Sequence, residues 1–342
     1  MPTSLAPLCR EIFDAQQLVA SFPPKLRDRN KKVVYRIACP TGSTHQGQLV
    51  FTRWPELLLP EHFPASGPKT ACEPREDVFG YEPTLPDSRT VEWYLNFAHH
   101  DLFCAYGGAL LAQDEMQVAE HPALASLREA LLHSSTVKPA TVENGQPTPV
   151  LIRGVERRCA IATDRNEEEG RPFGLYGNHF SSAKSDVVER ATRIIQPPTI
   201  TNLIAIEAPS YGSGVYSQSE IEYILRTAYS GFHAATLESA QAAVQASASA
   251  AAVVIIHTGF WGCGAYGGNR ILMALLQLLA AQAAGVDRLV FHTFDPAGSE
   301  AYSIAEGTLD RVCDSSDDLV DAKTVISRIH GLGLRWGTSD GN

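Results

Sequence analysis

Residues 253–284 contain the feature that most restricts how this chain can fold. The run 253–257 is apolar up to its final histidine, as in a strand covered on both faces. Five glycines follow within 258–268, and glycine lets a backbone take positive φ and approach a ligand closely. A long apolar helix predicted over 270–284 points free N–H groups back at this loop. The segment therefore predicts an anion site suited to a diphosphate.

From about residue 90 onward, strand-like and helix-like segments alternate. Strands are predicted at 91–98, 150–153, 203–207, 253–257 and 289–293, and helices at 113–132, 185–195, 219–229, 237–250, 270–284 and 319–329. Such alternation is typical of crossover connections between parallel strands. We therefore predict an α/β fold with a mixed, mostly parallel sheet flanked by helices on both faces.

The first 90 residues have a different character, because prolines recur through them. Proline removes a backbone donor and interrupts helices. We predict an irregular, Pro-rich segment over 1–90 that wraps the core, with short strands at 33–37 and 47–51, and a single compact core over 91–342.

Composition limits the classes of function. Lys and Arg number 28 against 38 Asp and Glu, a formal charge of −10 that argues against nucleic-acid binding. No run reaches the roughly 18 apolar residues of a membrane span, and the N-terminus lacks the pattern of a signal peptide. The seven cysteines form no Cys-x-x-Cys pair, and the histidines show no metal-binding spacing. We expect a cytoplasmic protein with no membrane partner, no cofactor and no catalytic metal.

A second glycine-containing loop precedes an acidic helix start. Tyr106-Gly107-Gly108-Ala109 leads to Gln113-Asp114-Glu115. Acids in a first helical turn are common, because the helix dipole stabilises them. A glycine loop directly before them lets a ligand lie against the backbone and face the carboxylates, and two carboxylates suit cleavage of a glycosidic bond.

One alternative reading is a nicotinamide dehydrogenase. Gly262-x-Gly264-x-x-Gly267 fits the dinucleotide fingerprint, and Asp295 ends the next predicted strand, where a ribose-binding acid is expected. The fingerprint lies too late in the chain to be followed by a second nucleotide-binding half and a substrate domain. Its loop is also longer and more aromatic than a pyrophosphate turn requires.

Both loops resemble those of the poly(ADP-ribose) glycohydrolases, enzymes with a macrodomain core. The resemblance extends over about residues 91–296 and rests on several motifs in order, at 96–98, 113–115, 202–208, 225–232, 258–268 and 291–295. It implies a macrodomain-like fold, with ADP-ribose and ADP-ribosylated proteins as partners.

The sequence departs from the family pattern near the acids. Only three residues, Leu110–Ala112, separate Gly107-Gly108-Ala109 from Gln113, a shorter connection than the family has. The first acid is Asp114, and His99 stands where the family has an asparagine. The variant resembles the branch of macrodomains that removes single ADP-ribose units from arginine side chains.

The resemblance implies roles for individual residues. Asp114 and Glu115 are the acid pair, in which one holds a ribose hydroxyl and the other protonates the leaving group or activates water; position favours Glu115 as acid–base, and Asp114 is the alternative. Asp101, on the loop after the first core strand, is a third candidate catalytic acid. The expected ADP-ribose-binding residues are Asn96, His99, Gly107, Gly108, Gln113, Tyr176, Gly259, Phe260, Trp261, Gly262, Cys263, Gly264, Ala265, Tyr266, Gly267 and Phe294.

These expectations define a hypothesis and its rivals. The favoured function is an ADP-ribosyl hydrolase acting on mono-ADP-ribosyl-arginine with water as nucleophile. A poly(ADP-ribose) glycohydrolase and a non-catalytic ADP-ribose-binding module are the alternatives, and the dehydrogenase is the remote one.

Overall fold

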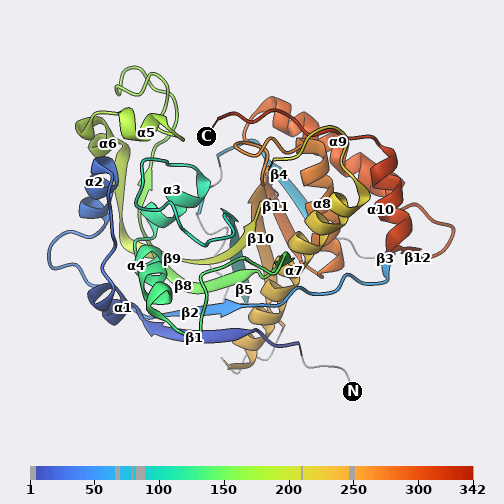
Figure 1. Cartoon of the computed structure of the whole chain (residues 1–342), viewed down its shortest axis with the longest axis horizontal. Coiled ribbons are helices and arrows are strands. Elements are labelled where there is room, and N and C mark those ends of the chain that lie inside the picture. The colour runs from blue at the N-terminus through green and yellow to red at the C-terminus, as the bar shows by residue number, and fades with distance from the viewer. Residues whose placement is uncertain are drawn as a thin grey trace.

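An eight-stranded sheet runs through the middle of the molecule (Figure 1). The computed structural model describes residues 5–65, 70–78, 80–81, 89–208, 211–245 and 251–341. The strand order is β1 (Cys9–Asp14), β2 (Gln48–Arg53), β8 (Val150–Ile161), β9 (Thr192–Glu207), β5 (Thr90–Ala98), β10 (Val253–Gly259), β11 (Arg288–His292) and β4 (Ala71–Arg75). Pairing from β9 to β4 is parallel, whereas β1, β2, β8 and β9 pair antiparallel. The predicted mixed, mostly parallel sheet is confirmed.

Helices cover both faces of this sheet, as predicted. One face packs on α7 (Gln218–Gln245), α8 (Arg270–Ala283), α9 (Pro296–Val312) and α10 (Ala322–Gly331), which lie to the right in Figure 1. The other face packs on α1 (Ala15–Ser21), α3 (Gln113–Glu120) and α4 (Ala123–His133). Each face has its own buried apolar cluster, so the sheet is covered along its central strands.

A third, smaller cluster lies beyond the end of β8. It joins α2 (Arg29–Ala38), α5 (His179–Ser182) and α6 (Ser185–Ala191) to the start of α3. Two short ladders complete the structure: β12 (Leu319–Asp321) with β3 (His62–Pro64), and β6 (Val142–Glu143) with β7 (Gln146–Pro147).

The N-terminal 90 residues are more regular than we expected. The predicted strand at 47–51 is confirmed as β2, and β1 and β4 extend the central sheet from the same part of the chain. The predicted strand at 33–37 is wrong, since these residues lie in α2. The Asp28 side chain caps that helix by accepting hydrogen bonds from the N–H groups of Asn30 and Lys31. Val33 and Val34 are buried on its inner face, so packing overrides their preference for strands.

Several predicted helices have different bounds. The single helix at 113–132 is divided into α3 and α4 at His121-Pro122, because proline cannot donate within a helix. The two helices at 219–229 and 237–250 form one, α7, over the described residues, and 246–250 lie outside them. Gly231 does not break α7. A β-carbon there would lie 2.9 Å from the Ile206 side chain, so glycine allows the helix to approach β9 closely.

The remaining differences concern strand ends and one missed helix. Residues 192–195, expected in a helix, begin the long strand β9, and β8 continues to Ile161. The helix expected at 319–329 starts only at Ala322, after β12. The helix α9 was not predicted; the Asp295 side chain caps it by accepting from the N–H of Gly298 at 2.6 Å, and Pro296 occupies its first turn. Across the described residues, no helix is both long and apolar enough to cross a membrane.

Candidate active site

A cavity of about 310 Å³ lies where the carboxyl ends of β9, β5 and β10 meet. Open α/β sheets bind ligands at this edge. Its walls come from the residues after β5, from the start of α3 and from the loops after β9 and β10. The lining residues are Phe97, His99, Cys104, Ala105, Leu110, Ala112, Gln113, Asp114, Glu115, Tyr176, Ala208, Tyr211, Phe260, Gly262, Gly264, Ala265 and Tyr266.

The Gln113 side chain fixes the start of α3 to the end of β5. Its Oε1 accepts a hydrogen bond from the Phe97 N–H at 2.8 Å, and its Nε2 donates to the Leu95 carbonyl at 2.9 Å. The backbone N–H of Gln113 donates to the Tyr176 hydroxyl at 3.2 Å. These bonds hold the acidic first turn of α3 against the sheet edge.

Asp114 is a buried carboxyl positioned by β5. Asn96, inside that strand, donates from Nδ2 to Asp114 Oδ1 at 3.1 Å and to Gln117 Oε1 at 2.7 Å. Burial and, second, the neighbouring Glu115 charge raise the pKa of Asp114 well above its ordinary value, against opposing effects of the Asn96 hydrogen bond and the Lys31 charge. Both of the larger effects favour the protonated form of this side chain.

Glu115 has a different environment. Its Oε2 accepts a hydrogen bond from the Ala112 N–H at 3.0 Å, so it also caps α3. Burial raises its pKa, while the Lys31 ammonium and backbone N–H groups act in the opposite direction. A carboxylate that accepts N–H bonds is favoured in its charged form, so the two adjacent acids have different surroundings.

The loop 259–268 forms the wall opposite the acids. Tight turns use some of its N–H groups: Cys263 donates to Phe260 O and Gly268 donates to Gly262 O. Within the described part of the chain, five N–H groups of the loop have no acceptor, and all belong to cavity-lining residues, Phe260, Gly262, Gly264, Ala265 and Tyr266. Backbone N–H groups of this kind form an anion site.

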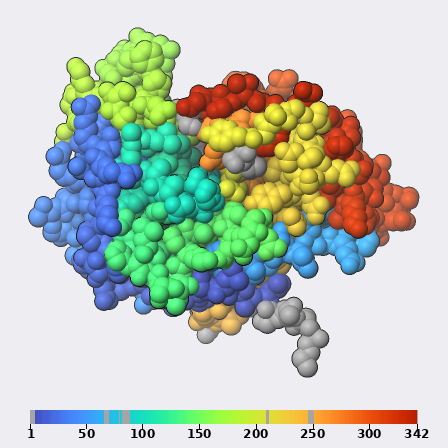
Figure 2. Space-filling view, in the orientation of Figure 1, coloured from blue at the N-terminus to red at the C-terminus, as the bar shows by residue number. Residues whose placement is uncertain are grey.

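The last described residues, 334–341, lie across this loop. Trp336 stacks on Tyr216 with ring centroids 4.3 Å apart, and Gly337 N donates to Gly267 O at 2.7 Å. Further on, Asn178 Nδ2 donates to the Gly341 carbonyl at 3.1 Å. In Figure 2 this red segment passes between the light-green segment around α5 and the yellow loop after β9. It therefore connects two walls of the cavity.

The structure brings ten of the predicted site residues together around the cavity. They are His99, Gln113, Asp114, Glu115, Tyr176, Phe260, Gly262, Gly264, Ala265 and Tyr266. Burial, and secondarily the adjacent His100, lowers the pKa of His99, whose Nδ1 accepts from the Asp101 N–H. Burial raises the pKa of Tyr176 to about 12, so its hydroxyl is protonated.

Other predicted residues of the glycine loop do not line the cavity. The Trp261 side chain is fully buried in the core and does not line the cavity. Cys263 packs against the same core, and burial raises the pKa of its thiol well above the ordinary value. Gly259 lies at the end of β10 and Gly267 lies against 337–339. These two glycines belong to the loop but lie on the side away from the cavity lining.

Gly107 and Gly108 are also absent from the lining of the cavity. A β-carbon on Gly107 would lie 2.5 Å from the Lys25 carbonyl oxygen, and the Gly107 carbonyl accepts from Arg27 and Asp28 N–H groups. A β-carbon on Gly108 would lie 3.2 Å from the Ala105 carbonyl oxygen. The second glycine loop therefore packs on the N-terminal segment.

Three further predicted residues have other positions. Asp101 does not line the cavity; its carboxylate forms a two-pronged ion pair with Arg128, at 2.6 and 2.9 Å, which favours a structural role. Asn96 is buried behind Asp114 and reaches the cavity only through that acid. Phe294 is 62% exposed beyond β11, outside the cavity, with a φ of 71° that is rare for an aromatic residue.

Sequence analysis missed part of the lining. Ala208 and Tyr211 follow β9, and the Tyr211 ring meets Tyr266 edge-on at 5.2 Å. The sequence could have indicated these residues, because neighbouring parallel strands end at the same edge of a sheet. The loop after the strand predicted at 203–207 therefore lies at the same edge as the cavity. Phe97, Cys104, Ala105, Leu110 and Ala112 are the other unpredicted lining residues.

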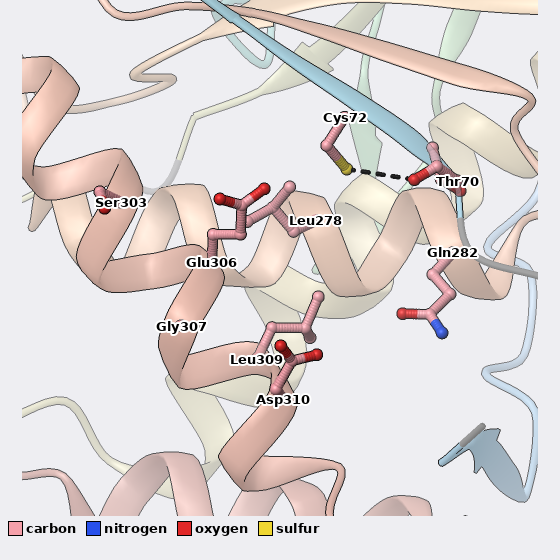
Figure 3. Close-up of a pocket in the computed structure, with 9 residues that line it drawn as sticks. All are labelled: Thr70, Cys72, Leu278, Gln282, Ser303, Glu306, Gly307, Leu309 and Asp310. Atoms are coloured by element: carbon pink, nitrogen blue, oxygen red, sulfur yellow. Dashed lines mark hydrogen bonds between the residues drawn. The ribbon is translucent and has the colours of Figure 1, made fainter.

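A second cavity, of about 450 Å³, lies between β4, α8 and α9 (Figure 3). The carboxylates of Glu306 and Asp310 and the amide of Gln282 are among its polar groups. It contains none of the predicted site residues, and no loop of amides faces it. Nowhere in the described residues do three or more His, Cys, Asp or Glu side chains form a group that could hold a metal ion.

Fold and cavity together define a class: a mixed α/β protein with a mostly parallel sheet, in which an amide-lined loop faces buried carboxyls at the strand ends. Residues 150–300 match the model of the family described as "Poly (ADP-ribose) glycohydrolase (PARG), Macro domain fold", a family of glycohydrolases. The match includes the loop 259–268 and spans less than half of the chain's 342 residues. The acidic start of α3 lies outside it.

Solved structures with a related arrangement are distant. The poly(ADP-ribose) glycohydrolase of Thermomonospora curvata bound to the inhibitor ADP-HPD is 14% identical, with a TM-score of 0.40, over 86% of this chain and 84% of that one. The enzyme of Deinococcus radiodurans in complex with ADP-ribose is 14% identical, with a TM-score of 0.40, over 88% and 95%. These TM-scores are too low for any function to be inferred from them. No curated protein matches the chain in sequence.

Proposed function

We propose that this protein is an ADP-ribosyl hydrolase that releases ADP-ribose from modified protein side chains. The observation that supports the proposal is the presence, in one cavity, of two buried adjacent acids and of five N–H groups that have no acceptor among the described residues. The amides suit a diphosphate, and the acids suit the sugar carbon whose bond is broken. Phe260, Tyr266 and Tyr211 give the cavity apolar walls for the ribose.

The reaction needs one bond made and one broken. Water oxygen forms a bond to the anomeric carbon while the bond to the acceptor atom breaks, and that atom keeps the electron pair. Glu115, as the carboxylate, accepts the proton lost by the water. Asp114, as the protonated acid, donates to a leaving oxygen. The proposal thus gives each acid one role: Glu115 activates the water, and Asp114 is the acid for the leaving group.

For the linkage, the first candidate is mono-ADP-ribosyl-arginine. It rests on the short connection Leu110–Ala112 beside the cavity. A guanidinium leaves as a neutral guanidine and needs little acid help, so ribose orientation and water activation become the main tasks.

A polymer of ADP-ribose is the second candidate. The raised pKa of Asp114 favours it, because an alkoxide leaving group requires a proton. The glycohydrolase family matched over 150–300 points the same way.

The non-catalytic binding module and the dehydrogenase receive less support. A module that only binds has no need of a buried acid pair. Asp295, the acid expected to hold a cofactor ribose, instead caps α9 and pairs with Arg270 at 2.9 Å. That contact removes the main argument for a nicotinamide cofactor.

The test compares ADP-ribose release from arginine-, serine- and glutamate-linked mono-modified peptides and from polymer. Release from at least one substrate is expected, and the double variant Asp114→Ala, Glu115→Ala should lose it while still binding free ADP-ribose. Tight binding with no release from any of the four substrates contradicts a hydrolase and identifies a binding module. Equal turnover by the double variant contradicts the assignment of the acids.

A further inference from the structure

Positive charge is concentrated in one part of the N-terminal segment. Six of the chain's 28 lysines and arginines lie within residues 25–36, beside a single acid, Asp28, although the chain as a whole has a formal charge of −10. Three of the six, Arg27, Arg29 and Lys32, are exposed. Over the described residues none of these three forms an ion pair, and Asp28 caps α2 instead. Such a concentration of cations in an acidic chain indicates a surface that binds an anion.

The first of these cations lies against a wall of the candidate active site. The Arg27 N–H donates to the Gly107 carbonyl at 2.9 Å, and a β-carbon on Gly108 would lie 3.7 Å from Arg27 Nη2. Ala105 and Leu110, in the same loop, line the cavity. Arg27 therefore contacts a loop whose other residues form part of the cavity wall.

The next cations lie where α2 meets the connection between α5 and α6. Arg29 donates from Nη2 to the Ala183 carbonyl at 3.0 Å. The fully buried Asn30 holds the two segments together, because its Nδ2 donates to the carbonyls of Phe180, at 2.7 Å, and Ala183, at 3.0 Å. Lys184 follows directly, is exposed, and forms no ion pair with any residue that the structure describes.

The three segments that carry these cations adjoin one another. Figure 2 shows the blue surface of α2 beside the teal loop that leads to α3 and beside the light-green segment around α5. Lys32 lies one helical turn after Arg29. We call the following four residues the cationic strip: Arg27, Arg29, Lys32 and Lys184.

A cavity of about 430 Å³, here called the Phe173 cavity, lies at the Lys184 end of the strip. Phe173 and His179 line it together with Lys184. Phe173 is 74% exposed, and its ring stacks on that of His179 with centroids 5.7 Å apart and planes at 22°. Exposed aromatic rings beside cations are the means by which proteins stack the bases of single-stranded nucleic acids. The loop continues from Phe173 to Tyr176, which lines the candidate active site, so one loop contributes to both cavities.

The carboxylates around the Phe173 cavity are held by other cations. Asp164 pairs with Arg171 at 3.1 Å, and Arg190 pairs with Asp186 at 3.0 Å and with Glu169 at 3.9 Å. These arginines and acids balance one another. The charge of the cationic strip therefore remains available for a ligand from solution.

The strip and the Phe173 cavity together match the chemistry of an adenine nucleotide. The cations suit a diphosphate, and the exposed ring suits the base. The acids of α3 stand where the bond to the rest of the substrate breaks, and in a polymer the rest begins with another ADP-ribose unit. An acidic protein segment would contact the cations but would leave the exposed ring unused.

We propose that the cationic strip and the Phe173 cavity bind the ADP-ribose unit beyond the bond that is cleaved, with its diphosphate on the strip and its adenine on Phe173. The inference rests on the proposed function, and it favours the polymer over mono-ADP-ribosyl-arginine as the substrate. It also gives the N-terminal segment a part in substrate binding.

The first test compares the binding of free ADP-ribose with that of a two-unit oligomer of ADP-ribose. Calorimetry uses the Asp114→Asn variant, so that the oligomer stays intact. The oligomer should bind about tenfold more tightly than ADP-ribose. The triple variant Arg27→Gln, Arg29→Gln, Lys184→Gln should remove this gain and leave the affinity for ADP-ribose unchanged. The slope of log affinity against log salt for the oligomer should fall by about 1.4, because two phosphate contacts are lost.

A second triple variant controls for net charge. Arg288, Arg311 and Lys323 lie on β11, α9 and α10, on the opposite side of the molecule from α2 in Figure 1. Arg288→Gln, Arg311→Gln, Lys323→Gln removes the same charge and should bind the oligomer normally. An equal loss of oligomer affinity in this variant overturns the proposal, because net charge alone then explains the effect.

The ring is tested separately. Phe173→Ala should lower the affinity for the oligomer about fivefold or more and leave that for ADP-ribose unchanged, because only the second adenine stacks on this ring. Phe173 is exposed, so its removal leaves the buried core intact. Unchanged oligomer affinity in Phe173→Ala overturns the placement of the adenine.

These measurements separate the binding site from the proposed activity. Tight binding of the oligomer that depends on the strip, in a protein that releases no ADP-ribose, supports the site and contradicts the hydrolase. Release of ADP-ribose by a protein that binds the oligomer no more tightly than ADP-ribose overturns the site. An oligoadenylate of equal charge should compete weakly with the oligomer; equal competition also overturns the proposal, because the surface then takes any adenine-containing polyanion.

Discussion

The two walls of the cavity are built by different means. The wall at the start of α3 uses side chains, Asp114 and Glu115, held by hydrogen bonds from Asn96 and from the Ala112 N–H. The wall at 259–268 uses backbone N–H groups, and its glycines keep the loop compact. A glycine-containing loop precedes the first wall, and a glycine-rich loop forms the second. Only the glycines of the second wall line the cavity. A glycine motif indicates that another group lies close to the backbone, but it does not show whether that group is a ligand or another part of the chain.

The largest expected effect separates chemistry from binding. Asp114→Asn keeps the shape of the side chain and its acceptor for Asn96, but removes the transferable proton. Turnover should fall about 10²- to 10⁴-fold, while the affinity for ADP-ribose changes little. Single-turnover kinetics and calorimetry check the two quantities, and Glu168→Gln, an exposed acid, serves as the control. If the affinity for ADP-ribose falls as much as turnover does, the acids and the amides do not have separate roles in catalysis and binding.

The next effect concerns the amide wall. A β-carbon at Gly268 would lie 2.7 Å from the Gly262 carbonyl oxygen, which is also the acceptor for the Gly268 N–H. Gly268→Ala should therefore open the loop and displace its free amides, weakening ADP-ribose binding about tenfold or more. Gly307→Ala, within α9 and with open space around it, is the matched control and should bind normally. Normal binding by Gly268→Ala means that the loop does not hold the diphosphate.

The corresponding change in the other glycine loop should act on stability. Gly107→Ala places a methyl group 2.5 Å from the Lys25 carbonyl oxygen, so the N-terminal segment must shift. We expect a loss of about 1–3 kcal/mol in the free energy of unfolding, with ADP-ribose affinity close to normal. Denaturant unfolding and calorimetry measure both. A tenfold loss of affinity without destabilisation contradicts this prediction and indicates that Gly107 contacts the ligand.

The sequence was sufficient for the sheet core and for the location of both walls. The buried strand β10 has a continuous apolar run, and the helix after its glycines begins at Asn269, whose side chain accepts from Leu272 N. Local patterns of this kind depend on neighbours in sequence, so they can be recognised without the fold.

What could not be predicted depends on contacts between distant parts of the chain. The Trp261 side chain is fully buried in the core, although a loop aromatic often faces a ligand. Lys31 and Glu115 are 84 residues apart, and no periodicity connects them. The strand expected at 33–37 became α2 because burial against α3 and α6 outweighed the preference of its valines.

The smallest expected effect comes from the segment 334–341, which lies across the loop 259–268. The Asp340 Oδ2 lies 3.0 Å from the position of a β-carbon on Gly264, beside amides suited to a diphosphate. Two anions at one loop repel each other, so Asp340→Asn should tighten ADP-ribose binding about two- to fivefold at low salt. The gain should shrink as salt rises, because the carboxylate is exposed and screened. Asp317→Asn, with the same loss of charge elsewhere, should show no gain; an equal gain there means that only net charge matters, and that Asp340 has no particular relation to the amide wall.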